Sequence, residues 1–143
     1  MPDLARFRRL FLFAEAVLLL TIARVAVKVI PFRFIARSIG TLVPVAAGPD
    51  DRKPSEVDAE TARRVRWAIG AAVRRAPFEL LCLPRSVAAH RMLTRRRVPA
   101  VLHFGIIRTP DGLSPGHAWV DAGGVEVVGY PIDPATVELG RLA

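Results

Sequence analysis

The feature that most constrains the fold is an unbroken helix-forming run from Leu4 to Ile30. It contains no proline or glycine, is rich in alanine and leucine, and is ended by Pro31. The run is apolar enough to suggest a membrane span. However, Glu15, Arg24 and Lys28 lie inside it, and a charge near the bilayer centre costs on the order of 2.5–3.5 kcal/mol. A signal peptide is not expected either, because the apolar stretch is too long and no small-residue cleavage site follows it.

We expect this helix to pack on the rest of the chain or to dock a partner. The alternative is a position on a membrane surface, which suits a helix whose start combines basic and aromatic side chains. These side chains are Arg6, Arg8 and Arg9 with Phe7, Phe11 and Phe13. A true span is the third reading. The chain is therefore expected in the cytoplasm, either free or associated with a membrane through this helix.

A second helix is predicted over residues 32–39, ended by Gly40. The composition then shifts to proline, glycine and aspartate, which predicts a surface linker. We therefore divide the chain into an N-terminal helical segment at residues 1–43, a linker at 44–54 and the main domain at 55–143.

Two more helices are predicted, at residues 55–75 and at about 83–96. The first begins with acidic side chains and ends with basic ones, as the helix dipole favours, and either Ser55 or Asp58 can cap it. In the second, Pro84 suits the first turn, where the N–H that proline lacks has no partner anyway.

Strands are predicted at residues 99–108, 117–122 and 125–128, with the last two joined by a hairpin turn at Gly123-Gly124. Residues 136–142 are expected to form a short tail. Helices followed by an antiparallel meander define an α+β domain.

The net charge of +8 comes almost entirely from arginine, since only Lys28 and Lys53 are lysines. Such a balance fits an acidic partner or an anionic membrane surface, or simply the amino-acid usage of a GC-rich genome. No basic run interleaved with aromatic residues is present, so we expect no nucleic-acid partner. A single cysteine, Cys82, forms no internal disulfide, and no cysteine–histidine cluster has metal-ligand spacing, so no metal or cofactor is expected.

Cys82 lies where a helix begins, and free backbone amides there favour a thiolate and can hold an oxyanion. A thiolate that attacks an amide also needs a proton donor for the leaving amine, which a histidine supplies. Of the three histidines, His90 lies on the helix and His103 in mid-strand. His117 starts a strand after a loop, so we favour it. The alternative is that Cys82 is only a small buried apolar residue.

Three segments carry a family resemblance: Cys82-Leu83-Pro84-Arg85-Ser86, Arg95-Arg96-Arg97-Val98-Pro99-Ala100 and Gly116-His117-Ala118-Trp119-Val120-Asp121. Together they resemble the lasso-peptide biosynthesis B proteins, the transglutaminase-like McjB C-terminal-domain family, over about residues 57–133. The resemblance implies a transglutaminase-like, papain-like cysteine protease fold with a Cys-His-Asp triad. It also implies that the protein removes the leader peptide from a ribosomally made precursor. Cys82 would be the nucleophile and His117 the general acid and base.

The third member of the triad is where the chain departs from the family. The family places an acid about a dozen residues after the histidine, where this chain reads Val-Val-Gly-Tyr from Val127 to Tyr130. Asp133 is the nearest downstream candidate, and we predict it as the third member, with a Cys-His dyad as the alternative. Asp121 lies about 13 Å along the strand from His117, too far to orient its ring.

The resemblance also implies partners: the precursor peptide, a separate PqqD-like leader-recognition protein and a macrolactam-forming cyclase. Two other functions stay open. The chain could be a non-catalytic peptide-binding or scaffolding protein of the same fold, or a Cys-His acyl or amide transferase.

Overall fold

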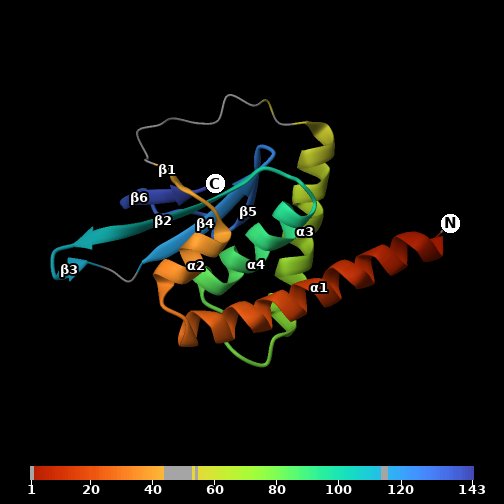
Figure 1. Cartoon of the computed structure of the whole chain (residues 1–143), viewed down its shortest axis with the longest axis horizontal. Helices are drawn as coiled ribbons and strands as arrows, with labels where there is room; N and C mark the ends of the chain where they lie inside the picture. The colour runs from red at the N-terminus through yellow and green to blue at the C-terminus, as the bar shows by residue number, and fades with distance from the viewer. Residues whose placement is uncertain (1, 44–52, 54, 114–115) are drawn as a thin grey trace.

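The computed structural model describes residues 2–43, 53, 55–113 and 116–143, and within them helices precede an antiparallel sheet (Figure 1). The predicted α+β class is confirmed. The helices are α1 (Pro2–Val29), α2 (Phe32–Ile39), α3 (Glu56–Arg75) and α4 (Cys82–Arg95). The strands are β1 (Leu42–Val43), β2 (Ala100–Thr109), β3 (Gly112–Leu113), β4 (His117–Ala122), β5 (Val125–Val128) and β6 (Thr136–Leu142).

The sheet has the order β1-β6-β2-β4-β5, and the short β3 forms a hairpin with the end of β2. The segment predicted as a tail is strand β6, which pairs antiparallel with β2, so that prediction was wrong. Its sequence hides the strand, because Val137 and Leu139 are exposed while Glu138 faces the protein. Backbone pairing with β2, and not an apolar alternation, holds it in place.

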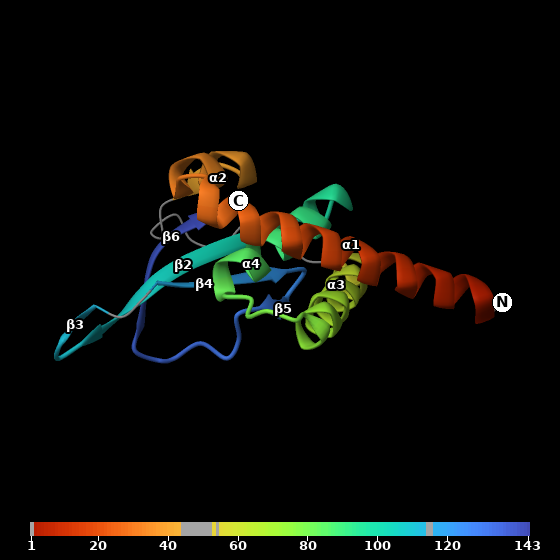
Figure 2. The ribbon, with the colours of Figure 1, turned by 90° about the horizontal axis from the view of Figure 1, so that it is seen from below.

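The core lies between the sheet and the helices. Helix α4 packs against β4 and β2, α3 packs against β5, and α1 crosses over both α3 and α4 (Figure 2). The largest fully buried side chains come from all of these layers: Leu20, Val65, Met92, Leu93, Leu102, Val120 and Leu142. The sheet therefore has one face covered by helices, and the start of α4 lies beside the start of β4.

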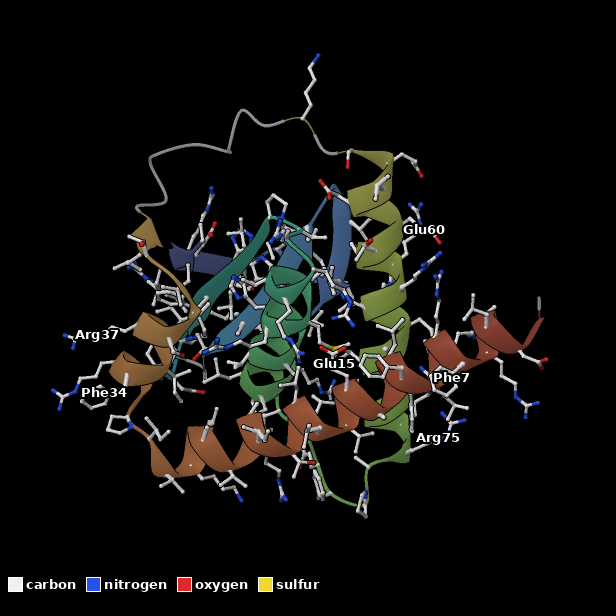
Figure 3. All side chains as sticks on the ribbon, turned by 45° about the vertical axis from the view of Figure 1, so that its right-hand side comes forward. Phe7, Glu15, Phe34, Arg37, Glu60 and Arg75 are labelled. Carbon is white, nitrogen blue, oxygen red and sulfur yellow. The ribbon has the colours of Figure 1, made fainter. Side chains whose placement is uncertain are left out.

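Helix α1 is held to the domain by a buried ion pair. Glu15, one of the charges inside the apolar run, is 8% exposed and accepts hydrogen bonds from Arg95 at 3.1 Å and from Arg96 (Figure 3). The expectation that this helix packs on the rest of the chain is confirmed. By length and composition alone, the segment Asp3–Val29 could also cross a membrane.

The predicted helix starts are close to the observed ones. Ser55, and not Asp58, caps α3, because its hydroxyl accepts the backbone N–H of Asp58 at 3.0 Å. Helix α4 begins at Cys82, one residue earlier than predicted. The predicted linker lies outside the described residues except for Lys53 and so stays a prediction.

Candidate active site

Cys82 is the first residue of α4, and its side chain is partly buried. Leu81 before it is extended, as the residue preceding a helix must be, and has no capping side chain. The Cys82 Sγ–H donates to the carbonyl oxygen of Gly116, with 3.8 Å between sulfur and oxygen. This contact brings the nucleophile candidate to the residue immediately before His117.

His117 is the first residue of β4 and pairs with Gly105 of β2. Its Nε2 lies 2.8 Å from the carbonyl oxygen of Gly129. Because a carbonyl oxygen only accepts hydrogen bonds, Nε2 must carry a proton. In the neutral ring this leaves the lone pair on Nδ1, so the imidazole is held in the tautomer in which Nδ1 is free to act as a base.

Gly129 can hold this position because it is a glycine. Its φ is 88°, in the left-handed region, and a Cβ built on it would lie 2.5 Å from the Ala118 carbonyl oxygen. The same Cβ would lie 2.7 Å from the Cβ of Trp119. No other residue fits here without movement of the backbone. The main chain thus provides the acceptor in the very stretch where the resembling family carries an acid.

Asp133, predicted as the third catalytic residue, is exposed, and its carboxylate accepts the backbone N–H of Ala135 at 2.8 Å. It shapes its own turn, whereas Nε2 of His117 binds Gly129. Within the described residues, no hydrogen bond joins Cys82 directly to His117. The structure therefore brings Cys82 and His117 to one corner of the fold and places Asp133 in the turn that leads into β6.

The imidazole of His117 also stacks on Trp119, with ring centroids 5.8 Å apart and planes at 22°. The other neighbour of Trp119 is His103, at 5.3 Å and 5°. The three rings form a column along neighbouring strands, since His103 and Trp119 are paired across β2 and β4. The stacking on Trp119 and the hydrogen bond to Gly129 together restrict rotation of the His117 ring.

Both ring nitrogens of His103 face carboxylates, an arrangement that favours the charged imidazolium over a free base. Its ring nitrogens contact carboxylates of Glu138 at 2.6 Å and Asp121 at 2.7 Å, and Glu138 also binds Arg141 at 2.7 Å. Burial by itself lowers the pKa of the His103 imidazole, but the two carboxylates outweigh burial and raise the pKa above its usual value. For Glu138, burial raises the pKa, but Arg141 and His103 outweigh it and bring that pKa below the usual range.

His90 does not belong to the site either. It is 3% exposed, and burial lowers the pKa of its imidazole; a backbone hydrogen bond with Ala100 opposes this lowering, and the charge of Arg91 adds to it. The buried ring, whose Nδ1 lies 3.4 Å from the Thr94 hydroxyl oxygen, packs in the core as part of α4. Among the described residues, no group of three or more His, Cys, Asp and Glu side chains is arranged to hold a metal ion.

A groove of about 570 Å³ adjoins the site between α3, α4 and β5. Gly129 lies at one side of it, and Arg85, one helical turn after Cys82, at another. Arg66 and Arg74 of α3 also line it, and within the described residues these three arginines make no ion pair with a carboxylate. The Nε of Arg85 is buried and has no acceptor among the described residues. The groove is therefore positively charged, and it reaches the site at Gly129.

A protein-family model described as transglutaminase-like superfamily matches residues 26–138, which is most of the chain. The chain therefore belongs to the transglutaminase-like superfamily. Membership indicates Cys–His hydrolase or transferase chemistry without specifying a substrate, and the match does not single out the lasso-peptide B proteins. Comparison with curated proteins and with solved structures gave no significant match.

Proposed function

We propose that the protein is a cysteine peptidase that removes the leader peptide from a ribosomally synthesised lasso-peptide precursor. The observation that carries this proposal is the corner where Cys82 starts α4 against the Gly116–His117 segment, with the His117 tautomer set by Gly129. The three segments that resemble the lasso-peptide B proteins contain this corner, and superfamily membership supports its chemistry.

The reaction would begin with rotation of the Cys82 side chain from the Gly116 carbonyl toward Nδ1 of His117. Sγ attacks the scissile carbonyl carbon as the thiol proton passes to Nδ1. Nδ1 then protonates the departing amine, the C–N bond breaks and an acyl thioester remains on Cys82. Water, deprotonated by Nδ1, attacks the thioester and releases the acid and the free thiol.

The start of α4 would stabilise the oxyanion in both steps. First-turn amides of a helix have no partner within the helix, and Pro84 has no N–H, so the amides of Cys82 and Leu83 are the donors. The arginine-lined groove supports a peptide substrate, because guanidinium groups bind carboxylates and Arg85 has a buried donor without an acceptor. A leader-recognition protein and a cyclase are the further partners that this function proposes.

The test is cleavage of a precursor peptide, with its recognition protein, by the full chain and by Cys82→Ala. We expect release of the leader by the unmodified chain, no release by the variant, and a mass increase of one water shared between the two products. Arg91→Ala, a change on the same helix away from Cys82, is the matched control and should cleave normally. Cleavage by Cys82→Ala would contradict the proposal.

Two observations favour a second candidate, a peptide-binding protein without catalysis. The Cys82 thiol donates a hydrogen bond to the Gly116 carbonyl and not to His117, and Gly129 stands where the resembling family carries an acid. In that case the folded chain and Cys82→Ala would bind the precursor equally and neither would cut it. A transferase would instead give a product in which an added amine, and not water, is joined to the acyl fragment.

A further inference from the structure

Helix α1 presents a second apolar face that the domain leaves uncovered. One side is buried on α3 and α4 through Ala16, Leu20 and Ala23. The opposite side exposes large apolar side chains along its whole length: Leu4, Phe7, Leu10, Phe11, Val17, Leu18, Ile22, Val25 and Val29. Phe7 is 70% exposed and Leu18 60%. We name these nine residues the outer face of α1. A continuous patch of this kind marks an interaction surface.

Cations border the outer face on both sides. At 3.6 residues per turn, Phe7, Phe11 and Leu18 lie almost on one line. By the same geometry, Lys28 falls about a quarter-turn and Arg6 about a third of a turn to one side of that line, and Arg8 falls about a quarter-turn to the other. All three cations are exposed. The acids of this helix do not offset them, because Glu15 is buried in its pair with Arg96 and the other, Asp3, sits at the N-terminal end.

The same combination continues into α2. Phe32 and Phe34 are exposed at 43% and 45%. The guanidinium groups of Arg33 and Arg37 lie 4.8 Å and 6.0 Å from the Phe34 ring centroid. Figure 3 shows Phe34 and Arg37 projecting outward at one end of the molecule, far from Phe7 near the other. Helix α2 thus adds exposed aromatic rings paired with cations next to the C-terminal end of α1.

This charge arrangement decides between occupants. Two copies of the chain would bring cationic borders together on molecules that each carry +8, whereas paired helices normally place opposite charges at such borders. A surface of anionic lipid supplies both an apolar layer for the phenylalanines and negative headgroups for the flanking cations. A span is disfavoured, because it would remove Glu15 from Arg95 and Arg96 and place its charge in hydrocarbon.

We propose that the outer face of α1 binds an anionic membrane surface, with the helix lying in the plane of the interface. Since α1 stays packed on α3 and α4, the domain sits on the membrane with the helix between them. This inference is independent of the proposed peptidase activity, because the outer face of α1 contains neither Cys82 nor His117, and all its residues but Val29 precede residue 26, where the superfamily match begins.

The test is co-sedimentation of the full chain with two kinds of vesicle, phosphatidylcholine alone and phosphatidylcholine mixed with phosphatidylglycerol. We expect binding to the anionic vesicles that weakens as salt rises. The double variant Phe11→Gln/Leu18→Gln should bind at least about tenfold more weakly, because each side chain loses much of an apolar burial term. Arg6→Gln/Arg8→Gln should lose most of the salt dependence.

The matched control is Val137→Gln/Leu139→Gln, which removes two exposed apolar side chains from β6 and should bind as the unmodified chain does. Circular dichroism and thermal unfolding verify that each variant is folded. Equal binding to both vesicles, or no binding by the folded chain, would overturn the proposal. So would a lipid-free dimer that Phe11→Gln/Leu18→Gln disperses, which would assign the face to a second copy. Oriented circular dichroism that places the helix along the bilayer normal would assign a span.

Discussion

At the scale of single residues, Gly129 governs the imidazole of His117. The hydrogen bond of 2.8 Å from Nε2 of His117 to the Gly129 carbonyl requires a backbone at φ 88°. An alanine is strained by about 1–2 kcal/mol in this conformation. We predict that Gly129→Ala moves the carbonyl, because the new Cβ would meet the Ala118 oxygen at 2.5 Å. The turnover number of the proposed peptidase should fall at least about tenfold, while binding of the peptide changes less.

Steady-state kinetics measures this effect, and the nitrogen chemical shifts of His117 report the loss of the single tautomer. Gly112→Ala is the control, because Gly112 also has a positive φ, 133°, but a Cβ at this position would have nothing within 4 Å. Asp133→Asn is the contrast. We expect little change, because an amide oxygen can still accept the Ala135 N–H. A loss of about 10⁴ in turnover with Asp133→Asn would instead make Asp133 the orienting acid.

The pair at the corner was predictable from residue types, and its acceptor was not. A lone cysteine at a helix start and a histidine at a strand start are visible in sequence, because both depend on side chains and local breaks. The hydrogen-bond acceptor for His117 is the backbone carbonyl of Gly129. Every residue has such a carbonyl, so the amino-acid sequence does not indicate which one is used. The available signal was negative, a glycine in the stretch where an acid was expected, and only the left-handed φ of Gly129 explains it.

At the scale of elements, β6 shows where local patterns fail. Strands β2, β4 and β5 follow from β-branched runs and a Gly-Gly turn, and the caps and charges of α3 follow from its ends. Strand β6 carries Gly140 and charged residues, and backbone pairing with β2 on one side and β1 on the other holds it in the sheet. Gly140 is needed there, since a Cβ would lie 2.6 Å from the Phe104 ring. Such long-range pairing leaves no local periodicity to read.

Strand β6 also brings Glu138 to His103, and this gives a pH-dependent stability. The pKa of His103 is raised in the folded state above the unfolded value of 6.5. The unfolded chain therefore loses its proton first as pH rises, and the stabilising ion pair is complete below pH 6.5. We predict that the stability of the unmodified chain relative to His103→Gln is largest there and declines as pH rises through the folded-state pKa.

Urea unfolding of both proteins across the range measures this difference. His90, whose pKa is lowered, has the opposite dependence, but it is present in both proteins and cancels in the difference. A difference that is constant with pH, or that grows above pH 6.5, would contradict a charged His103.

At the scale of the whole molecule, α4 joins the two surfaces that we assign. Its first residue is Cys82, and Arg95 and Arg96 at its other end hold Glu15 of α1. The apolar run of α1 predicted a helix that packs on the rest of the chain or on a partner. The local sequence does not indicate the partner of Glu15, because Arg95 lies 80 residues further along the chain. Packing of α1 therefore depends on one buried carboxylate as well as on the apolar contacts of Leu20.

We predict that Glu15→Gln destabilises the fold by about 1–3 kcal/mol, because a buried acceptor of charged hydrogen bonds is weakened while Arg95, at 62% exposure, can return to water. Urea unfolding measures the loss, with the exposed Glu79→Gln as a control that should change little.

The same pair of Glu15 allows a test of whether α1 stays packed on the domain when the protein binds a membrane. If α1 stays docked when vesicles bind, anionic lipid should raise the unfolding temperatures of the unmodified chain and of Glu15→Gln by similar amounts, because it binds the folded state of both through the same outer face. No rise in the unfolding temperature of the unmodified chain on anionic vesicles that it binds would mean that α1 leaves the domain on binding.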